Sequence, residues 1–121
     1  MRIHHIAFRT DDVERLERFY VDIIGLSLLR RLRRAAHDGG TSVWLGIGDA
    51  ILMLEHASPD EPRMRAGCME MIAFDIEKEA RVGWLRRLSE AGVAIEAQTE
   101  HTLYFRDPDG RRIGISSYRR E

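Results

Sequence analysis

The chain has 121 residues and a mass of 14.0 kDa, with 44% hydrophobic and 32% charged residues. This composition argues against disorder, and the length predicts a single domain, 1–121, because one core usually forms from roughly 100 to 200 residues. Nineteen basic and twenty acidic side chains give a net charge of −1. A nearly neutral chain is not drawn to nucleic acid or to an anionic membrane, so neither is expected as a partner.

Cysteine usage and the N-terminal residues bear on the compartment. The single cysteine, Cys68, cannot form an intrachain disulfide, and residues 1–5 lack the apolar run of a signal peptide. The longest apolar stretch, residues 50–54, is far shorter than the roughly 20 residues that span a bilayer. We therefore expect a cytoplasmic protein.

The first half of the chain predicts a strand, a helix and three further strands. Residues 3–9 alternate in character, and Asp11 with Glu14 has the spacing of a capping box for a helix that ends before Gly25. Further strands are predicted over residues 27–36, 41–45 and 50–56, with turns at 37–40 and 46–49. The order of elements is βαβββ.

The second half repeats this order. The segment His5-Ile6-Ala7-Phe8 matches Met71-Ile72-Ala73-Phe74 at an offset of 66 residues. A second helix carries Val82, Leu85 and Leu88 before Gly92, and strands are predicted over 93–97, 102–106 and 112–118.

The repeat predicts an α+β fold of tandem βαβββ modules. Module 1 covers about residues 1–57, a linker with two prolines about 58–67, and module 2 about 68–121. We expect the modules to form a curled mixed sheet with the helices outside and a central cleft. Such a cleft is the default ligand site.

Three segments carry a resemblance to a known superfamily. They are His5-Ile6-Ala7-Phe8, Phe19-Tyr20-Val21-Asp22-Ile23-Ile24-Gly25-Leu26 and Tyr104-Phe105-Arg106-Asp107-Pro108-Asp109-Gly110. Through them the chain resembles the vicinal oxygen chelate superfamily, which includes glyoxalase I, extradiol dioxygenases, methylmalonyl-CoA epimerase and the fosfomycin and bleomycin resistance proteins. The resemblance covers almost the whole chain, and it implies a homodimer in which modules of two chains share a cleft.

The resemblance also implies four metal-ligand positions, one in the first and one in the last strand of each module. His5 matches the first, but Met71 stands at the second histidine position and Gly114 at the last acid. The remaining acid falls on Met53, or on Glu55 if the strand is shifted by two residues. A thioether and a glycine are poor substitutes for the hard or borderline donors that divalent ions need. We therefore expect a degenerate metal site and no cofactor.

Alternation along the strands predicts which side chains line the cleft. The predicted ligand-binding residues are Arg9, Trp44, Met53, Glu55, Met71, Asp75, Tyr104 and Arg112. The two methionines would give an adaptable lining for a flat organic ligand, or would simply fill a closed interior. Arg9 and Arg112 are candidates to contact an acidic ligand group, and Trp44 and Tyr104 are candidates to stack on an aromatic one.

These observations leave three functional hypotheses. The first is a glyoxalase/bleomycin-resistance-like protein that binds a small organic molecule in the methionine-lined cleft without a complete metal site. The alternative is a lyase, isomerase or dioxygenase of the same superfamily, with His5 and Glu55 as its catalytic candidates and as ligands of nickel, iron, zinc or manganese. The third is a regulatory or assembly module that meets another protein. Whether the chain is an enzyme stays open.

Overall fold

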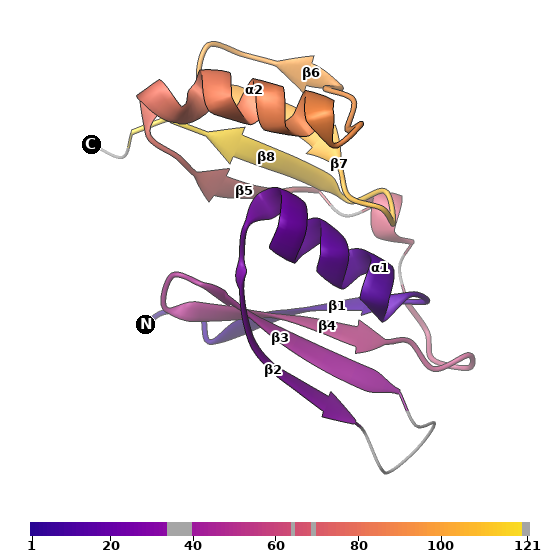
Figure 1. The fold of residues 1–121 in the computed structure, drawn as a ribbon. Helices are drawn as coiled ribbons and strands as arrows, with labels where there is room; N and C mark the ends of the chain where they lie inside the picture. Colours follow the sequence, from indigo (N-terminus) through magenta and orange to yellow (C-terminus); the bar gives the residue numbers. More distant parts are fainter. Residues whose placement is uncertain (34–39, 64, 69, 120–121) are drawn as a thin grey trace. The chain divides into compact units, whose positions relative to one another are not determined.

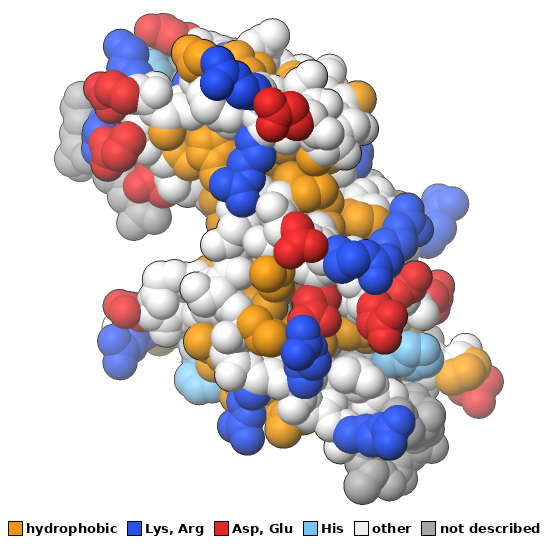
Figure 2. All heavy atoms as spheres, viewed as in Figure 1, with side chains coloured by type: hydrophobic (Ala, Val, Ile, Leu, Met, Phe, Trp, Pro, Cys, Tyr) orange, Lys and Arg blue, Asp and Glu red, His pale blue; other side chains and the backbone are white. Residues whose placement is uncertain are grey.

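A computed structural model describes residues 1–33, 40–63, 65–68 and 70–119 of the chain. The chain divides into two compact units, Met1–Arg63 and Met64–Glu121, and each is a βαβββ module (Figure 1). This confirms the predicted α+β fold of two tandem modules. None of the described helices has the length and apolar character needed to cross a membrane. Acidic and basic side chains are interspersed over the face shown in Figure 2, as expected from the small net charge.

The first unit is a mixed four-stranded sheet with a helical segment on one face (Figure 1). Its strands, in spatial order, are β1 (His5–Thr10), β4 (Ala50–His56), β3 (Thr41–Ile47) and β2 (Ser27–Arg33). Strand β1 runs parallel to β4, and the other neighbours are antiparallel. Helix α1 (Val13–Arg18) continues into a π-helical stretch, Phe19–Ile24, and together they bury Leu16, Phe19 and Tyr20.

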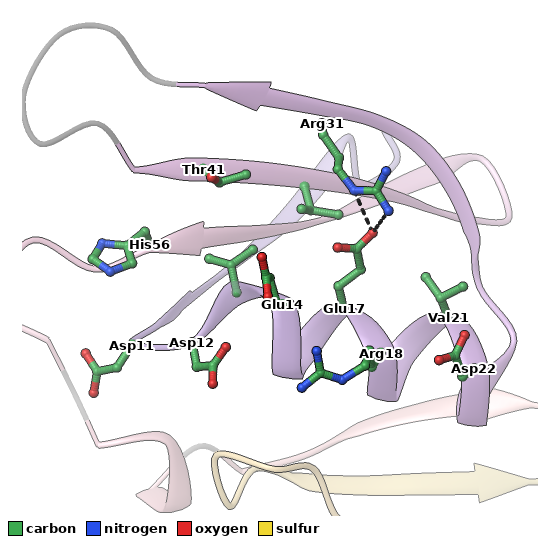
Figure 3. A pocket seen from close by; sticks show the side chains of 12 residues that line it. Asp11, Asp12, Glu14, Glu17, Arg18, Val21, Asp22, Arg31, Thr41 and His56 are labelled. Atoms are coloured by element: carbon green, nitrogen blue, oxygen red, sulfur yellow. Dashed lines mark hydrogen bonds and ion pairs between the residues drawn. The ribbon is translucent and has the colours of Figure 1, made fainter.

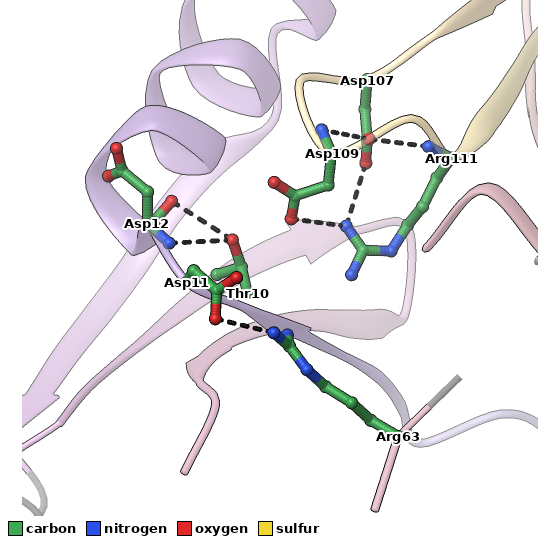
Figure 4. A network of polar contacts seen from close by, with 7 residues as sticks. All are labelled: Thr10, Asp11, Asp12, Arg63, Asp107, Asp109 and Arg111. Atoms are coloured by element: carbon green, nitrogen blue, oxygen red, sulfur yellow. Dashed lines mark hydrogen bonds and ion pairs between the residues drawn. The ribbon is translucent and has the colours of Figure 1, made fainter. Parts of the chain in front are cut away.

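Helix α1 is capped by Asp12 and not by Asp11. The Asp12 Oδ1 atom accepts a hydrogen bond from the backbone N–H of Arg15 at 3.0 Å, whereas the Asp11 carboxylate accepts one from Arg63 at 2.7 Å (Figure 4). The predicted capping box at Asp11 is wrong by one residue because β1 extends to Thr10. The Thr10 hydroxyl accepts a hydrogen bond from the Asp12 N–H at 3.1 Å and so fixes the turn between strand and helix.

The remaining boundaries of the first unit follow the prediction closely. Gly25 ends the helical segment with φ of 91°, a left-handed conformation that glycine adopts without steric cost. Strand β3 continues to Ile47, two residues beyond the prediction, so the turn narrows to residues 48–49, while β4 has the predicted bounds. The last part of the predicted strand 27–36 and most of the predicted turn 37–40 lie outside the described residues.

The second unit has the same topology. Its strands, in spatial order, are β5 (Ile72–Asp75), β8 (Arg112–Ser116), β7 (Thr102–Arg106) and β6 (Ala97–Gln98), and β5 runs parallel to β8. Short 3₁₀ turns at Ala66–Cys68 and Lys78–Ala80 precede β5 and α2 (Arg81–Glu90). The strand predicted over 93–97 is observed only as β6, over residues 97–98. Of residues 93–96, only Glu96 donates a backbone hydrogen bond to β7, from its N–H to the Tyr104 carbonyl.

The inward stripe of α2 also differs from the prediction. Val82 is 68% exposed, and Leu88 is fully buried. Trp84 and Leu85 are half-buried and lie one turn before Leu88, so the stripe follows positions 81, 84, 85 and 88. Val82 falls outside this stripe because it follows the half-buried Arg81 by one residue and so projects about 100° further around the helix.

Alternation along the strands gives each sheet two faces. The helix-side face forms the core, with Phe8, Val43, Leu45, Leu52 and Leu54 in the first unit and Leu103, Phe105, Ile113 and Ile115 in the second. The opposite face of each sheet is called here the helix-free face. The strand residues predicted to bind a ligand lie on these helix-free faces.

The cap gives a direct test of the fold. The substitution Asp12→Ala removes the acceptor for the Arg15 N–H, and loss of such a cap costs about 1 kcal/mol of unfolding free energy. The matched substitution Asp11→Ala removes only an exposed ion pair, and its loss of unfolding free energy should be only a few tenths of that of Asp12→Ala. Urea unfolding of both variants measures the difference. An Asp11→Ala variant as destabilised as Asp12→Ala would contradict the cap assignment.

Candidate functional site

The backbone register defines equivalent rows on the two helix-free faces. In the first unit Met53 of β4 pairs with Ala7 of β1 on one side and Trp44 of β3 on the other. In the second unit Gly114 of β8 occupies the same place, between Ala73 of β5 and Tyr104 of β7. The two rows correspond strand by strand, so Met53 is the counterpart of Gly114.

This register decides which residue of β4 stands at the expected acid position. Glu55 pairs with Arg9, one step along the helix-free face, and its counterpart in the second unit is Ser116, which pairs with Asp75. By this correspondence Met53, and not Glu55, is the counterpart of Gly114. Of the four positions that were expected to hold metal ligands, only that of His5 carries a side chain suited to a divalent ion.

The space beside Gly114 is occupied by the sulfur of Met71. A Cβ atom built on Gly114 would lie 3.2 Å from Cβ of Ala73, 3.4 Å from Cγ2 of Thr102 and 3.5 Å from Sδ of Met71. Met71 lies just before β5 and is 40% exposed. In the part of the chain that the structure describes, no three His, Cys, Asp or Glu side chains gather into a metal-binding group. The side chains at these positions are one imidazole, of His5, and two thioethers, of Met53 and Met71, with no side chain at Gly114.

His5 lies at the exposed start of β1. Its Nδ1 atom is 2.8 Å from Nδ1 of His4, a hydrogen bond in which one ring donates and the other accepts, and the two rings meet edge to face. The neighbouring imidazole is thus its hydrogen-bond partner.

Glu55 is held by an arginine from the adjacent strand. It is 4% exposed, and its Oε2 atom accepts a hydrogen bond from Nη1 of Arg9 at 2.7 Å. The Nε atom of Arg9 lies 3.3 Å from Oε1 of Glu61, so one guanidinium serves two carboxylates. Removing Arg9 would take away the cation that is bound to the Oε2 atom of this buried carboxylate, which is costly. A ligand anion would have to displace Glu55 or Glu61 from Arg9, so this arginine is a structural partner.

Each helix-free face carries an arginine stacked on an aromatic ring. The Arg30 guanidinium lies 5.1 Å from the centre of the Trp44 ring, whose Nε1 donates a hydrogen bond to Ser42 at 3.2 Å. Arg112 lies 4.4 Å from the centre of the Tyr104 ring. Such cation–π contacts orient the guanidinium without neutralising its charge.

A pocket in the second unit opens beside the predicted ligand residues. It has a volume of about 530 Å³ and is lined by Ala73, Phe74, Asp75, Ser116, Tyr118 and Arg119. Three of these, Ala73, Asp75 and Ser116, belong to the helix-free face. Ser116 is fixed by a 2.9 Å hydrogen bond to the Thr102 hydroxyl, and the exposed Tyr118 packs edge to face on His101.

A larger pocket, of about 770 Å³, lies on the helix side of the first unit and was not predicted (Figure 3). Glu14 and Glu17 point from α1 toward the strands, and Glu17 accepts a 2.9 Å hydrogen bond from Nε of Arg31. His56 is also in the lining, and its buried Nδ1 atom finds no hydrogen-bond partner among the residues that the structure describes. In the sequence, the only indication of this pocket was the i, i+3 spacing of Glu14 and Glu17. Glutamates on an exposed helix face commonly have the same spacing, so the pocket could not be predicted from it.

The most specific motif of the second unit is a turn. The Asp107 Oδ1 atom accepts hydrogen bonds from the N–H groups of Asp109 and Arg111, both at 2.9 Å (Figure 4). The Arg111 guanidinium bonds the carboxylates of Asp107 at 3.3 Å and Asp109 at 3.0 Å. Gly110 has φ of 94°, which strongly favours glycine. The turn that joins β7 to β8 is therefore held by internal hydrogen bonds, with Asp107 and Arg111 buried at its two ends.

Comparison with known proteins identifies relatives along nearly the whole chain. Metallothiol transferase FosB of Staphylococcus epidermidis is 28% identical over 119 residues, which cover 93% of this chain and 79% of that protein. Glutathione transferase FosA of Serratia marcescens is 27% identical over 120 residues, covering 93% and 78%.

A solved structure shows the same fold. The fosfomycin resistance protein FosX of Listeria monocytogenes, in complex with Mn(II) and 1S,2S-dihydroxypropylphosphonic acid, superposes with a TM-score of 0.78 at 16% identity, covering 98% of this chain and 93% of that one. The family model of the glyoxalase/bleomycin resistance protein/dioxygenase superfamily matches residues 2–115. The chain therefore belongs to this superfamily, also called the vicinal oxygen chelate superfamily.

Proposed function

We propose that the protein binds a small organic molecule on the helix-free faces of its sheets without a divalent metal, in the manner of a sequestering resistance protein. The observation that carries this proposal is the residue types at the expected ligand positions, Met53, Met71 and Gly114. The register makes Met53 the counterpart of Gly114, and the sequence repeat makes Met71 the counterpart of His5. The Met71 sulfur beside Gly114 gives that region a polarizable lining suited to organic groups. The 530 Å³ pocket next to Ala73 supplies a volume in the range of small-molecule sites.

A second candidate is a metal-dependent enzyme, and the relatives favour it. FosB and FosA are named as transferases, and the FosX structure contains Mn(II). In this chain such an enzyme would have to use His5 and Glu55. The hydrogen bond of Glu55 to Arg9 opposes that use, because a carboxylate that ligates a metal would have to give up a partner inside a buried site.

Restoring the missing ligands tests the metal argument. We expect the wild-type chain, incubated with nickel, iron, zinc or manganese and then desalted, to retain no stoichiometric metal. The double substitution Met71→His with Gly114→Glu adds a nitrogen and an oxygen donor at adjacent places and should retain roughly one ion per chain. Elemental analysis gives the ratio, and the single substitution Met71→His is the matched control. Stoichiometric metal in the wild type that disappears in His5→Ala would establish the enzyme candidate instead.

Ligand binding should be insensitive to chelators. In a thermal-shift screen of organic compounds we expect at least one to raise the Tm by the same amount with and without EDTA. The substitution Met71→Lys should abolish this shift and leave the Tm of the free protein nearly unchanged, since Met71 is 40% exposed. The equally drastic Val82→Lys on α2, at a 68% exposed position, should keep the shift. A stabilisation that vanishes with EDTA would refute metal-independent binding.

The proposal includes a homodimer, on the resemblance to the superfamily alone. Sedimentation velocity at micromolar concentration should then show one species of twice the chain mass. A monomer under these conditions would contradict the homodimer with a shared cleft, and the ligand would then have to bind to a single chain.

A further inference from the structure

The arginines of the helix-free faces differ in how their charges are balanced. Arg9 serves two carboxylates, Glu55 and Glu61. Arg106 binds Glu96 with two hydrogen bonds, from Nε at 2.9 Å and from Nη2 at 2.8 Å. The Nε atom of Arg112 is buried and has no hydrogen-bond acceptor among the residues that the structure describes.

Glu96 is the carboxylate nearest to Arg112, but it is already engaged. Its Oε2 atom lies 3.7 Å from Nε of Arg112, too far for a hydrogen bond. The hydrogen bonds from Arg106 hold the pKa of the Glu96 carboxyl below its ordinary value, so it stays charged at neutral pH. Two guanidinium groups therefore share one carboxylate, so the positive charges of this cluster, Arg106 and Arg112, exceed its negative charge by one.

The surroundings of Arg112 suit a flat ligand. Its guanidinium stacks on Tyr104, which pairs with Gly114 in the row that ends at Ala73. This row offers an aromatic ring, a position without a side chain and a methyl group, with the Met71 sulfur beside it. A planar group lying over Gly114 could direct a carboxylate to the outer amino groups of Arg112, and a guanidinium fork matches carboxylate geometry.

We infer that the ligand of the second unit is a planar organic carboxylate, recognised by the stacked Arg112–Tyr104 pair over Gly114. This inference rests on the proposed binding function and names the ligand class of that site. Glu96 acts as an internal competitor of the ligand carboxylate, because its Oε2 atom is the anionic group closest to the Arg112 guanidinium. Arg106 in turn keeps Glu96 away from Arg112.

The test compares three probes of one shape and different charge. Benzoate, benzamide and benzamidinium are titrated into the ¹⁵N-labelled full chain, and amide chemical shifts of β8 and β7 report binding. We expect benzoate to bind roughly tenfold more tightly than benzamide, and benzamidinium to bind least. A benzamide affinity equal to that of benzoate would overturn the inference.

Two variants should change the benzoate affinity in opposite directions. Arg112→Gln should remove the preference for benzoate over benzamide, and Glu96→Gln should strengthen benzoate binding severalfold by removing the competing carboxylate. Arg86→Gln on the exposed face of α2 changes the net charge as much as Arg112→Gln does and should leave the affinity unchanged. Unaltered benzoate preference in Arg112→Gln, or weaker benzoate binding in Glu96→Gln, would contradict the assigned roles.

The same titrations separate this inference from the proposed function. If benzoate leaves β8 unshifted while a neutral compound from the thermal-shift screen shifts it, the carboxylate class is wrong and the binding function stands. If no compound shifts the amides of either helix-free face, both are wrong.

Discussion

The parallel pairing of the first and last strand in each unit is the constraint on which the rest of the structure depends. It brings β1 against β4 and β5 against β8, so residues from the two ends of a module meet on one face. Phe8 and Leu54, paired in register and buried against the helical segment, fix this alignment. A slip by one residue would turn them to the helix-free face and bury Arg9 in the core. The chemistry of the faces therefore follows from the packing of the core.

Within that register, Met71 and Gly114 form a complementary pair. The glycine leaves a space that the thioether borders. A Cβ atom at position 114 would lie 3.5 Å from the Met71 sulfur, an ordinary contact, and 3.2 Å from Cβ of Ala73, a close one. A thioether needs no hydrogen-bond partner, so no polar group of the Met71 and Gly114 side chains requires an ion for its hydrogen bonding. A histidine at position 71 beside an acid at 114 would instead present two polar groups that need a shared partner, which in metal-binding proteins is the ion. Met71 and Gly114, at the positions expected to hold a histidine and an acid, are thus packing neighbours.

The sequence predicted the topology because the two modules repeat the order of strands, helix and terminal glycine. Alternation also placed the predicted cleft residues of β1, β4, β5 and β8 on one face of each sheet, in agreement with the register. It could not choose between Asp11 and Asp12 as the cap, since both side chains are competent and only the length of β1 decides. It also could not choose the phase of α2, because the apolar residues of that helix, which include Val82 and Trp84, fit two overlapping stripes.

The partners of charged residues were beyond prediction for a different reason. Glu61 reaches Arg9 from the segment that follows β4, and Glu96 approaches Arg106 and Arg112 from just before β6. Both approaches depend on how a loop returns to its sheet, which periodicity does not encode. The register of β4 was equally inaccessible, and it makes Met53, and not Glu55, the counterpart of Gly114.

Arginines in this chain show that residue type and position are insufficient to identify a binding group. Arg111 and Arg112 are adjacent, yet the first is buried in the turn between two aspartates and the second lies stacked on Tyr104. A guanidinium enclosed by carboxylates stabilises the fold, and its affinity for a further anion is reduced by the charge already beside it. A stacked guanidinium keeps its charge while its orientation is fixed. The balance of neighbouring charge, more than the presence of an arginine on the right face, therefore determines where an anion can bind.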